Sequence, residues 1–141
     1  MSPISPKQIE LVQASWQKVV PVADDAAQLF YVRLFTLDPS LQELFRGDMQ
    51  EQGRKLMSMI DFAVKALTRL ETLLPGLRAL GERHGRYGVR DEHYDTVAEA
   101  LIWTLQKGLG PAFTPEVKAA WVAAYGVLSS TMKDAATVEV P

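Results

Sequence analysis

The sequence predicts an all-α protein with one hydrophobic core, and we expect residues 1–141 to form a single domain. Apolar residues recur at spacings of three and four along almost the whole chain, which is typical of amphipathic helices. Several of these runs follow a serine, aspartate or threonine with proline beside it, a pair that favours a helix start. No run alternates apolar and polar residues between hairpin turns, so we expect no strand. The tail, residues 135–141, is expected to be disordered.

The first two helices are marked by proline. Ser5 can cap the first helix, Pro6 fits its first turn because the missing N–H needs no partner there, and Gln8 completes a capping box. Pro21 ends this helix, because its ring would clash with the preceding turn. A second helix is expected over residues 22–36, with apolar residues on its inward side.

The middle of the chain contains a short helix and a long one. Asp38 and Pro39 repeat the combination of cap and proline and open a short helix that carries Phe45 near its end. Residues 46–50 are expected to form a loop. A long helix then covers residues 51–69, with a stripe of apolar residues along one side.

The last part of the chain contains three more helix starts. Pro75 is expected to begin a helix, which the glycines at 85 and 88 end. Asp91 can cap the next helix, and the Thr-Pro pair at 114–115 opens the last one. The sequence therefore predicts six to eight helices in all.

Composition and charge exclude several classes of protein. The chain is 48% hydrophobic and 23% charged, as in average soluble proteins, and no stretch approaches the roughly 18 apolar residues of a membrane span. Residues 1–7 lack the basic and apolar regions of a secretory signal. Without cysteine there is no disulfide framework and no thiol nucleophile. The 15 basic and 17 acidic residues include no basic block suited to nucleic acid, so we expect a soluble, cytoplasmic protein.

Few residues are suited to catalysis. Two histidines without cysteine make a multi-ligand zinc site hard to build, and the chain has no His-Glu-x-x-His motif or glycine-rich phosphate loop. Carboxylates such as Asp61 are expected on solvent faces, and His93 is expected to face solvent or to help cap its helix. His84 differs because it shares the apolar side of its helix with Leu77 and Leu80. Taken alone, it is either a core histidine bonded to a carbonyl or a ligand.

A set of residues that occur in order along these helices is more informative than any one of them. The set consists of Trp16 in the first helix, Phe45 in the short helix, Gln52 and Leu56 in the long helix, and then His84. With this arrangement the chain resembles the globin family over nearly its whole length. Residues 109–115, Leu-Gly-Pro-Ala-Phe-Thr-Pro, are similar to those of neuroglobins and their bacterial single-domain relatives.

The resemblance implies a globin fold around haem b, with His84 as the proximal ligand of the iron. It implies that Phe45 stacks on the haem and that Leu56 covers the iron with apolar surface, while Lys55 either reaches a propionate or stays in solvent. The residues expected to contact the haem are Phe45, Lys55, Leu56, Leu80, His84, Val89, Tyr94 and Val97.

The resemblance also implies a polar distal pair made of Tyr31 and Gln52. The phenol O–H and the amide N–H are suited to donate hydrogen bonds to bound dioxygen, and each such bond to a charged acceptor contributes about 1.5–3 kcal/mol. Even one bond would slow release by roughly 10- to 100-fold. Because Gln52 stands where neuroglobins have a histidine, we expect an open, five-coordinate ferrous iron. The expected function is tight, reversible binding of dioxygen and of carbon monoxide and nitric oxide, with oxygen transport as one role.

Two other functions stay open. Flavohaemoglobins use a globin domain to oxidise nitric oxide, and Tyr94 matches the tyrosine that they join to the proximal histidine. Ala136 stands where they have a glutamate, and the chain contains no flavin or nicotinamide domain, so nitric oxide dioxygenation would need an external reductase. A gas sensor would need a transmitter domain or partner.

Overall fold

The computed structural model describes residues 4–45, 47–86 and 91–138; the side chains of residues 70, 73, 84–86, 91 and 133–138 are outside this description. The described residues form six α-helices and four 3-10 helices and contain no strand, which confirms the predicted all-α class. In chain order the elements are α1 (Pro6–Val19), η1 (Val20–Val22), α2 (Ala23–Leu37), η2 (Pro39–Leu44), α3 (Met49–Lys65), η3 (Ala66–Arg69), α4 (Leu70–Arg86), α5 (Asp91–Leu109), η4 (Gly110–Ala112) and α6 (Pro115–Val138).

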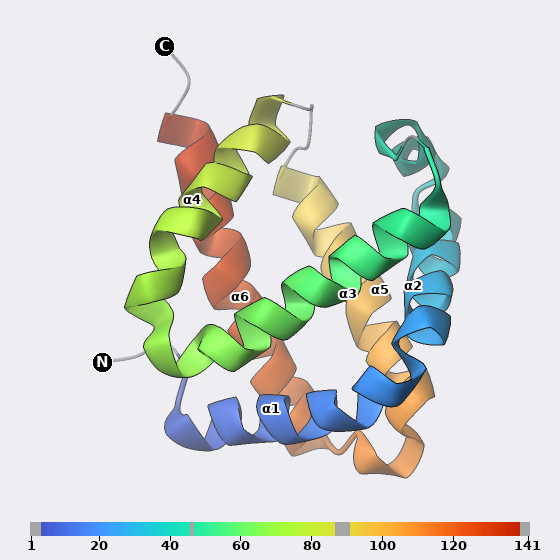
Figure 1. Ribbon diagram of the computed structural model, residues 1–141, viewed down its shortest axis with the longest axis vertical. Helices are drawn as coiled ribbons and strands as arrows, with labels where there is room; N and C mark the ends of the chain where they lie inside the picture. Colours follow the sequence, from blue (N-terminus) through green and yellow to red (C-terminus); the bar gives the residue numbers. More distant parts are fainter. Residues whose placement is uncertain (1–3, 46, 87–90, 139–141) are drawn as a thin grey trace.

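The helices pack as crossing pairs around a central space. Figure 1 shows α3 running diagonally in front of α5 and α6, with α1 along the lower edge and α4 along the left side. The most extensive pairings are α4 with α6, α2 with α5, α1 with α6, and α2 with α3. Because α3 and α4 diverge from their junction at η3, a gap opens between them over α5 and α6.

Side-chain caps fix the predicted helix starts. The Ser5 N–H donates to Gln8 Oε1 at 3.0 Å and the Gln8 N–H donates to Ser5 Oγ at 3.1 Å, which is the predicted capping box. Asp38 Oδ1 accepts from the Ser40 N–H at 3.1 Å at the start of η2. Thr114 Oγ1 accepts from the Val117 N–H at 3.2 Å at the start of α6. Each cap replaces a backbone partner that the first helical turn lacks.

The start of α4 differs from the prediction. A helix start at Pro75 is wrong, because α4 begins five residues earlier, at Leu70, and contains Pro75. A proline there removes one backbone hydrogen bond, to the carbonyl of Glu71. Glu71 is exposed, so water can bond to that carbonyl instead.

Two other boundaries also differ. Asp48 Oδ1 accepts from the Gln50 N–H at 2.9 Å, so α3 begins at Met49, inside the expected loop. The helix expected over 51–69 ends at Lys65 and continues as η3. At the other end of the chain, α6 extends to Val138, four residues into the tail for which we expect disorder.

The core lies where α1, α2, α5 and α6 meet. Its most deeply buried large side chains are Trp16, Ile4, Leu34, Leu105 and Val12. Among the described residues, every helix is too short or too polar to cross a lipid bilayer.

Candidate functional site: an apolar cavity between α3, α4, α5 and α6

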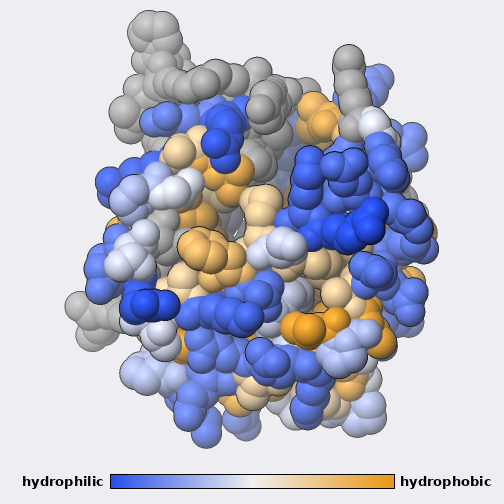
Figure 2. Space-filling model, in the orientation of Figure 1, coloured by the Kyte–Doolittle hydropathy of each residue, from blue (hydrophilic) through white to orange (hydrophobic). Residues whose placement is uncertain are grey.

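A cavity of about 600 Å³ occupies the central space. This volume is within the range of small-molecule and cofactor sites, which are mostly apolar. Figure 2 shows apolar surface gathered in the gap between α3 and α4, bordered by hydrophilic side chains. The main lining residues are Leu56, Met59, Ile60, Phe62 and Ala63 of α3, Leu77, Leu80 and Arg83 of α4, His93, Tyr94, Val97 and Leu101 of α5, and Trp121, Ala124, Tyr125, Leu128 and Met132 of α6.

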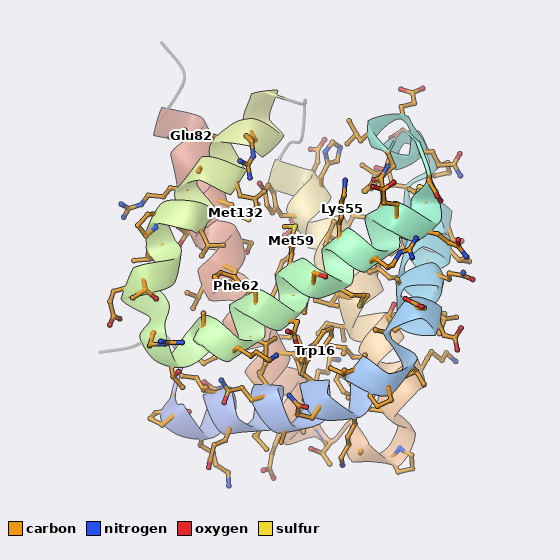
Figure 3. The ribbon with its side chains drawn as sticks, in the orientation of Figure 1. Trp16, Lys55, Met59, Phe62, Glu82 and Met132 are labelled. Atoms are coloured by element: carbon orange, nitrogen blue, oxygen red, sulfur yellow. The ribbon has the colours of Figure 1, made fainter. Side chains whose placement is uncertain are left out.

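The mouth of the cavity lies along α3. Leu56 and Ile60 are four residues apart and are half-buried on the same side of the helix. Met59 and Phe62 line the same space but are 45% and 66% exposed, respectively. Figure 3 shows both side chains on α3, beside the gap that faces α4. Large apolar side chains left in solvent around a cavity are typical of a ligand-binding site.

The inner wall is held by a bond between α6 and α5. The Tyr125 hydroxyl donates to the backbone oxygen of Tyr94 at 2.6 Å. Burial raises the pKa of Tyr125 above the ordinary range, so its hydroxyl stays protonated and remains a donor. The bond therefore fixes the backbone at the start of α5, where Tyr94 and Val97 line the cavity.

The residues expected to contact haem fall into three groups. Leu56, Leu80, Tyr94 and Val97 line the cavity. Phe45 packs against the core and is not among the residues that line the cavity. The Lys55 side chain is 72% exposed, and its Nζ lies 3.6 Å from Glu51 Oε1. The backbone of His84 lies in α4, but its side chain is outside the described part of the structure, as is all of Val89.

Tyr31 lies in an aromatic cluster and is not among the residues that line the large cavity. Its ring centroid is 5.4 Å from that of Phe45 and 6.0 Å from that of Phe35, spacings at which aromatic rings attract one another. Its ring also faces α3, because a Cβ placed on Gly53 would lie 3.8 Å from Tyr31 Cε2. Burial raises the pKa of Tyr31 to about 12, so the phenol is protonated at neutral pH. Gln52, the neighbour of Gly53, is half-buried.

Tyr31 lines a second, smaller cavity of about 380 Å³. Apolar groups of Ala27, Tyr31, Phe35 and Met49 line it together with polar groups of Asp24, Gln28, Gln50 and Arg54. It opens between α2 and the start of α3, so the ring of Tyr31 lies between this opening and the core.

Two residues that were expected on solvent faces, His93 and Asp61, are less exposed than predicted. His93 is 8% exposed and lines the large cavity, so the prediction of a solvent-facing side chain is wrong. The signal was present in the sequence, because His93, Val97 and Leu101 are spaced by four and share one side of α5. Asp61 is only one-third exposed, and its Oδ1 accepts from the buried Trp16 Nε1–H at 2.9 Å.

The fold and the cavity define a class: α-helical proteins that enclose an apolar ligand or prosthetic group between their helices. The globin family model matches residues 28–132, and the chain therefore belongs to the globin family. This membership supports a haem-containing, gas-binding protein.

Curated relatives and solved structures agree with this family. Neuroglobin of Danio rerio is 34% identical over 94% of this chain and 92% of its own length, and that of Tetraodon nigroviridis is 33% identical with the same coverage. An engineered carbene transferase from Rhodothermus marinus, whose parent is provisionally assigned as a nitric oxide dioxygenase, is 25% identical with a TM-score of 0.85, over 96% of this chain and 94% of that one. A hexacoordinated haem protein from an anhydrobiotic tardigrade has the same TM-score at 17% identity, over 96% of each chain, and shows the shared fold alone.

Proposed function

We propose that the cavity holds haem b, with His84 as the iron ligand. The observation that carries this proposal is the apolar cavity of about 600 Å³ beside α4. Leu77 and Leu80 line it from α4, and position 84 follows them at helical spacing, seven and four residues on. The haem iron supplies the gas-binding centre, and one proximal histidine is enough to hold it.

The cavity lining fits a flat apolar group with acidic substituents. Leu56, Ile60 and Val97 offer apolar walls from two helices. Arg83 lines the cavity yet is exposed, so its guanidinium can pair with a propionate at the edge. The exposed Lys55 is held by Glu51 in a surface pair, an interaction weak enough for the ammonium group to exchange partners.

Tyr31 and Gln52 are proposed as donors to the bound gas. Tyr31 is supported by its protonated phenol and by the contact of its ring with α3 beside Gly53. Gln52 is supported by its place one turn before Leu56, which lines the cavity. A glutamine is a poor iron ligand, so the proposed ferrous protein is five-coordinate and open to dioxygen, carbon monoxide and nitric oxide.

The test is the rate of oxygen release from the ferrous protein, measured by stopped-flow displacement with carbon monoxide. Tyr31→Phe and Gln52→Val are each expected to speed release by roughly 10- to 100-fold, because each removes a hydrogen bond to a charged acceptor. Gln50→Val is the matched control, because Gln50 lies on the same helix as Gln52 but its side chain is exposed.

Three results would contradict parts of this proposal. Unchanged release rates in both variants would contradict the proposed hydrogen bonds from Tyr31 and Gln52 to the bound gas. A six-coordinate spectrum of the ferrous protein without added ligand would contradict the open iron site. A purified protein without haem absorption would contradict haem binding itself.

Nitric oxide dioxygenation is the second candidate, supported by the likeness to the Rhodothermus marinus protein. The reaction combines nitric oxide, dioxygen and one electron to give nitrate, and an external reductase would supply the electron. The test is nitrate formation from nitric oxide in air with a catalytic amount of reductase and an excess of its nicotinamide electron donor. More than one nitrate per haem is expected for an enzyme, and a single nitrate per haem would contradict turnover. The cytoplasmic location, bacterial origin and oxygen-transport role stay predictions.

A further inference from the structure

Two tryptophans connect the large cavity with the surface of α3. Trp121 of α6 lines the cavity and is 3% exposed. The ring of Trp16, from α1, lies 6.1 Å from it between centroids, with the planes inclined by 58°. Figure 3 shows Trp16 between α1 and α3, where the indole meets α3 at Asp61. The two rings are thus within the range of direct aromatic contact.

The two indole N–H groups have partners of different basicity. Trp16 Nε1–H donates to Asp61 Oδ1 at 2.9 Å, and Lys65 Nζ lies 2.9 Å from Asp61 Oδ2. Both contacts favour the ionised carboxylate, but loss of an electron makes the Trp16 N–H strongly acidic, and the carboxylate can then accept its proton. Trp121 Nε1–H donates to Ser15 Oγ at 2.8 Å. The Ser15 hydroxyl in turn donates to the Leu11 carbonyl at 2.7 Å, and a hydroxyl in this position is a poor base. A proton released from Trp16 therefore has an acceptor, whereas one released from Trp121 has none of comparable strength.

We propose that Trp121, Trp16 and Asp61 form a relay that carries an oxidising equivalent from the cavity to the surface. The relay rests on the proposed function, because it needs a redox-active cofactor in the cavity and hydrogen peroxide as oxidant. Trp121 would supply one electron to the cofactor that hydrogen peroxide has oxidised, and Trp16 would replace the electron that Trp121 has lost. Because the reduction of hydrogen peroxide to water takes two electrons, the relay would run twice for each peroxide. The Trp16 Nε1 proton moves to Asp61, leaving a neutral indolyl radical and a neutral carboxyl group. A one-electron reductant of the ascorbate class then restores Trp16, and Asp61 returns the proton.

Two other aromatic side chains, Trp103 and Tyr125, are less suited to this step. Trp103 lies under two cations, with Arg33 Cζ 5.2 Å and Lys107 Nζ 5.5 Å from its ring centroid. Positive charge at this distance opposes removal of an electron from the ring. The Tyr125 hydroxyl donates to a backbone carbonyl, which does not accept a proton at neutral pH. Only Trp16, among these side chains, combines contact with a cavity residue and a carboxylate partner.

The relay predicts where oxidation accumulates. The full-length ferric haem protein is mixed with equimolar hydrogen peroxide, and oxidation of each tryptophan is located by peptide mass spectrometry. We expect oxidation at Trp16 that is lost in Trp121→Phe and retained in the matched control Trp103→Phe. Near-ultraviolet circular dichroism of each variant verifies that the core is intact. Equal oxidation of Trp16 with and without Trp121 overturns the relay and leaves the haem proposal standing.

A second arm tests the proton step without haem chemistry. The same protein is flashed with a soluble ruthenium photo-oxidant, and the optical spectrum of the tryptophan radical is recorded. The neutral radical is expected in the wild type. In Asp61→Asn the amide oxygen still accepts the hydrogen bond but cannot take the proton, so the radical cation is expected to persist. The same neutral radical in both proteins overturns the role of Asp61. If the purified protein carries no haem, the haem proposal fails. The photo-oxidation experiment then still tests whether the Trp16 proton moves to Asp61.

Discussion

The carboxylate of Asp61 is held between a buried indole and an exposed ammonium group. Its Oδ1 accepts from Trp16 Nε1–H and its Oδ2 lies 2.9 Å from Lys65 Nζ. The bonds to Lys65 and to Trp16 lower the pKa of Asp61 below its ordinary value of 3.8, because both favour the ionised form. Without this carboxylate, the polar end of an otherwise apolar Trp16 would be buried without a protein partner.

This arrangement predicts a pH-dependent contribution to stability. Asp61→Ala is expected to lower the free energy of unfolding by about 1–3 kcal/mol at neutral pH, since it leaves a buried N–H unpaired. A lowered folded-state pKa stabilises the protein above the unfolded value. The charge-dependent part is thus fully present above about pH 4 and lost as the pH falls through the lower folded value.

Urea denaturation of the wild type and Asp61→Ala between pH 2 and 7 checks this prediction. The gap between the two proteins is expected to narrow toward the acid end. Asp61→Asn, which keeps an oxygen for Trp16, is expected to lose less stability at neutral pH than Asp61→Ala. A gap that stays constant with pH would show that the charge of Asp61 does not contribute.

Such pairings between distant residues are what the sequence predicts least well. Asp61 looks like a surface carboxylate because helical spacing reveals which side of one helix a residue lies on, but not which neighbouring helix covers that side. The burial of His93 could have been predicted, because His93 continues the apolar stripe of Val97 and Leu101. Leu56, Leu80, Tyr94 and Val97 line the cavity, and they were expected through the globin resemblance and not from spacing alone.

At the scale of helices, the packing of α4 on α6 depends on one glycine. A Cβ placed on Gly81 would lie 2.6 Å from Met132 Cα and 2.8 Å from its carbonyl carbon, distances that real Cβ atoms do not adopt. The obstacle is backbone, which cannot turn away as a flexible side chain could. The two helices can therefore approach this closely only while position 81 has no side chain.

Gly81→Ala is expected to lower the free energy of unfolding by about 1–3 kcal/mol, as overpacking does. Gly76→Ala is the matched control in the same helix, because a Cβ there meets nothing within 4 Å. In that variant the higher helix propensity of alanine is expected to raise stability by up to about 1 kcal/mol. Guanidinium denaturation of both variants provides the measurement. Equal effects would show that the helices can separate at little cost.

Helix starts with a side-chain cap could be predicted, whereas starts set by the neighbouring chain could not. Ser5, Asp38 and Thr114 each bond to a backbone N–H close by in sequence, so the signal is local. The start of α4 is different, since that helix follows η3 directly and continues through Pro75. Packing against α6 along the length of α4 outweighs the single hydrogen bond that the proline removes.

At the scale of the whole molecule, the large cavity separates helices that would otherwise pack against one another in a single core. An apolar space of about 600 Å³ without a ligand lacks the contacts that stabilise a packed interior. A tightly bound ligand at a thousand times its dissociation constant adds about 4 kcal/mol, which corresponds to a rise of roughly 10–20 °C in Tm. The proposed haem would thus contribute to stability by filling the cavity and by ligation through the proposed ligand, His84.

These two contributions can be separated with protoporphyrin IX, which has the shape of haem without the iron. Protoporphyrin IX is expected to raise the Tm of the wild type and of His84→Ala by similar amounts, since only filling of the cavity is involved. Haem is expected to raise the Tm of the wild type further than that of His84→Ala, because only the wild type can ligate the iron. Differential scanning calorimetry of the haem-free, porphyrin-loaded and haem-loaded proteins measures both. Equal stabilisation of the two proteins by haem would show that His84 does not hold the iron, even though the cavity binds the macrocycle.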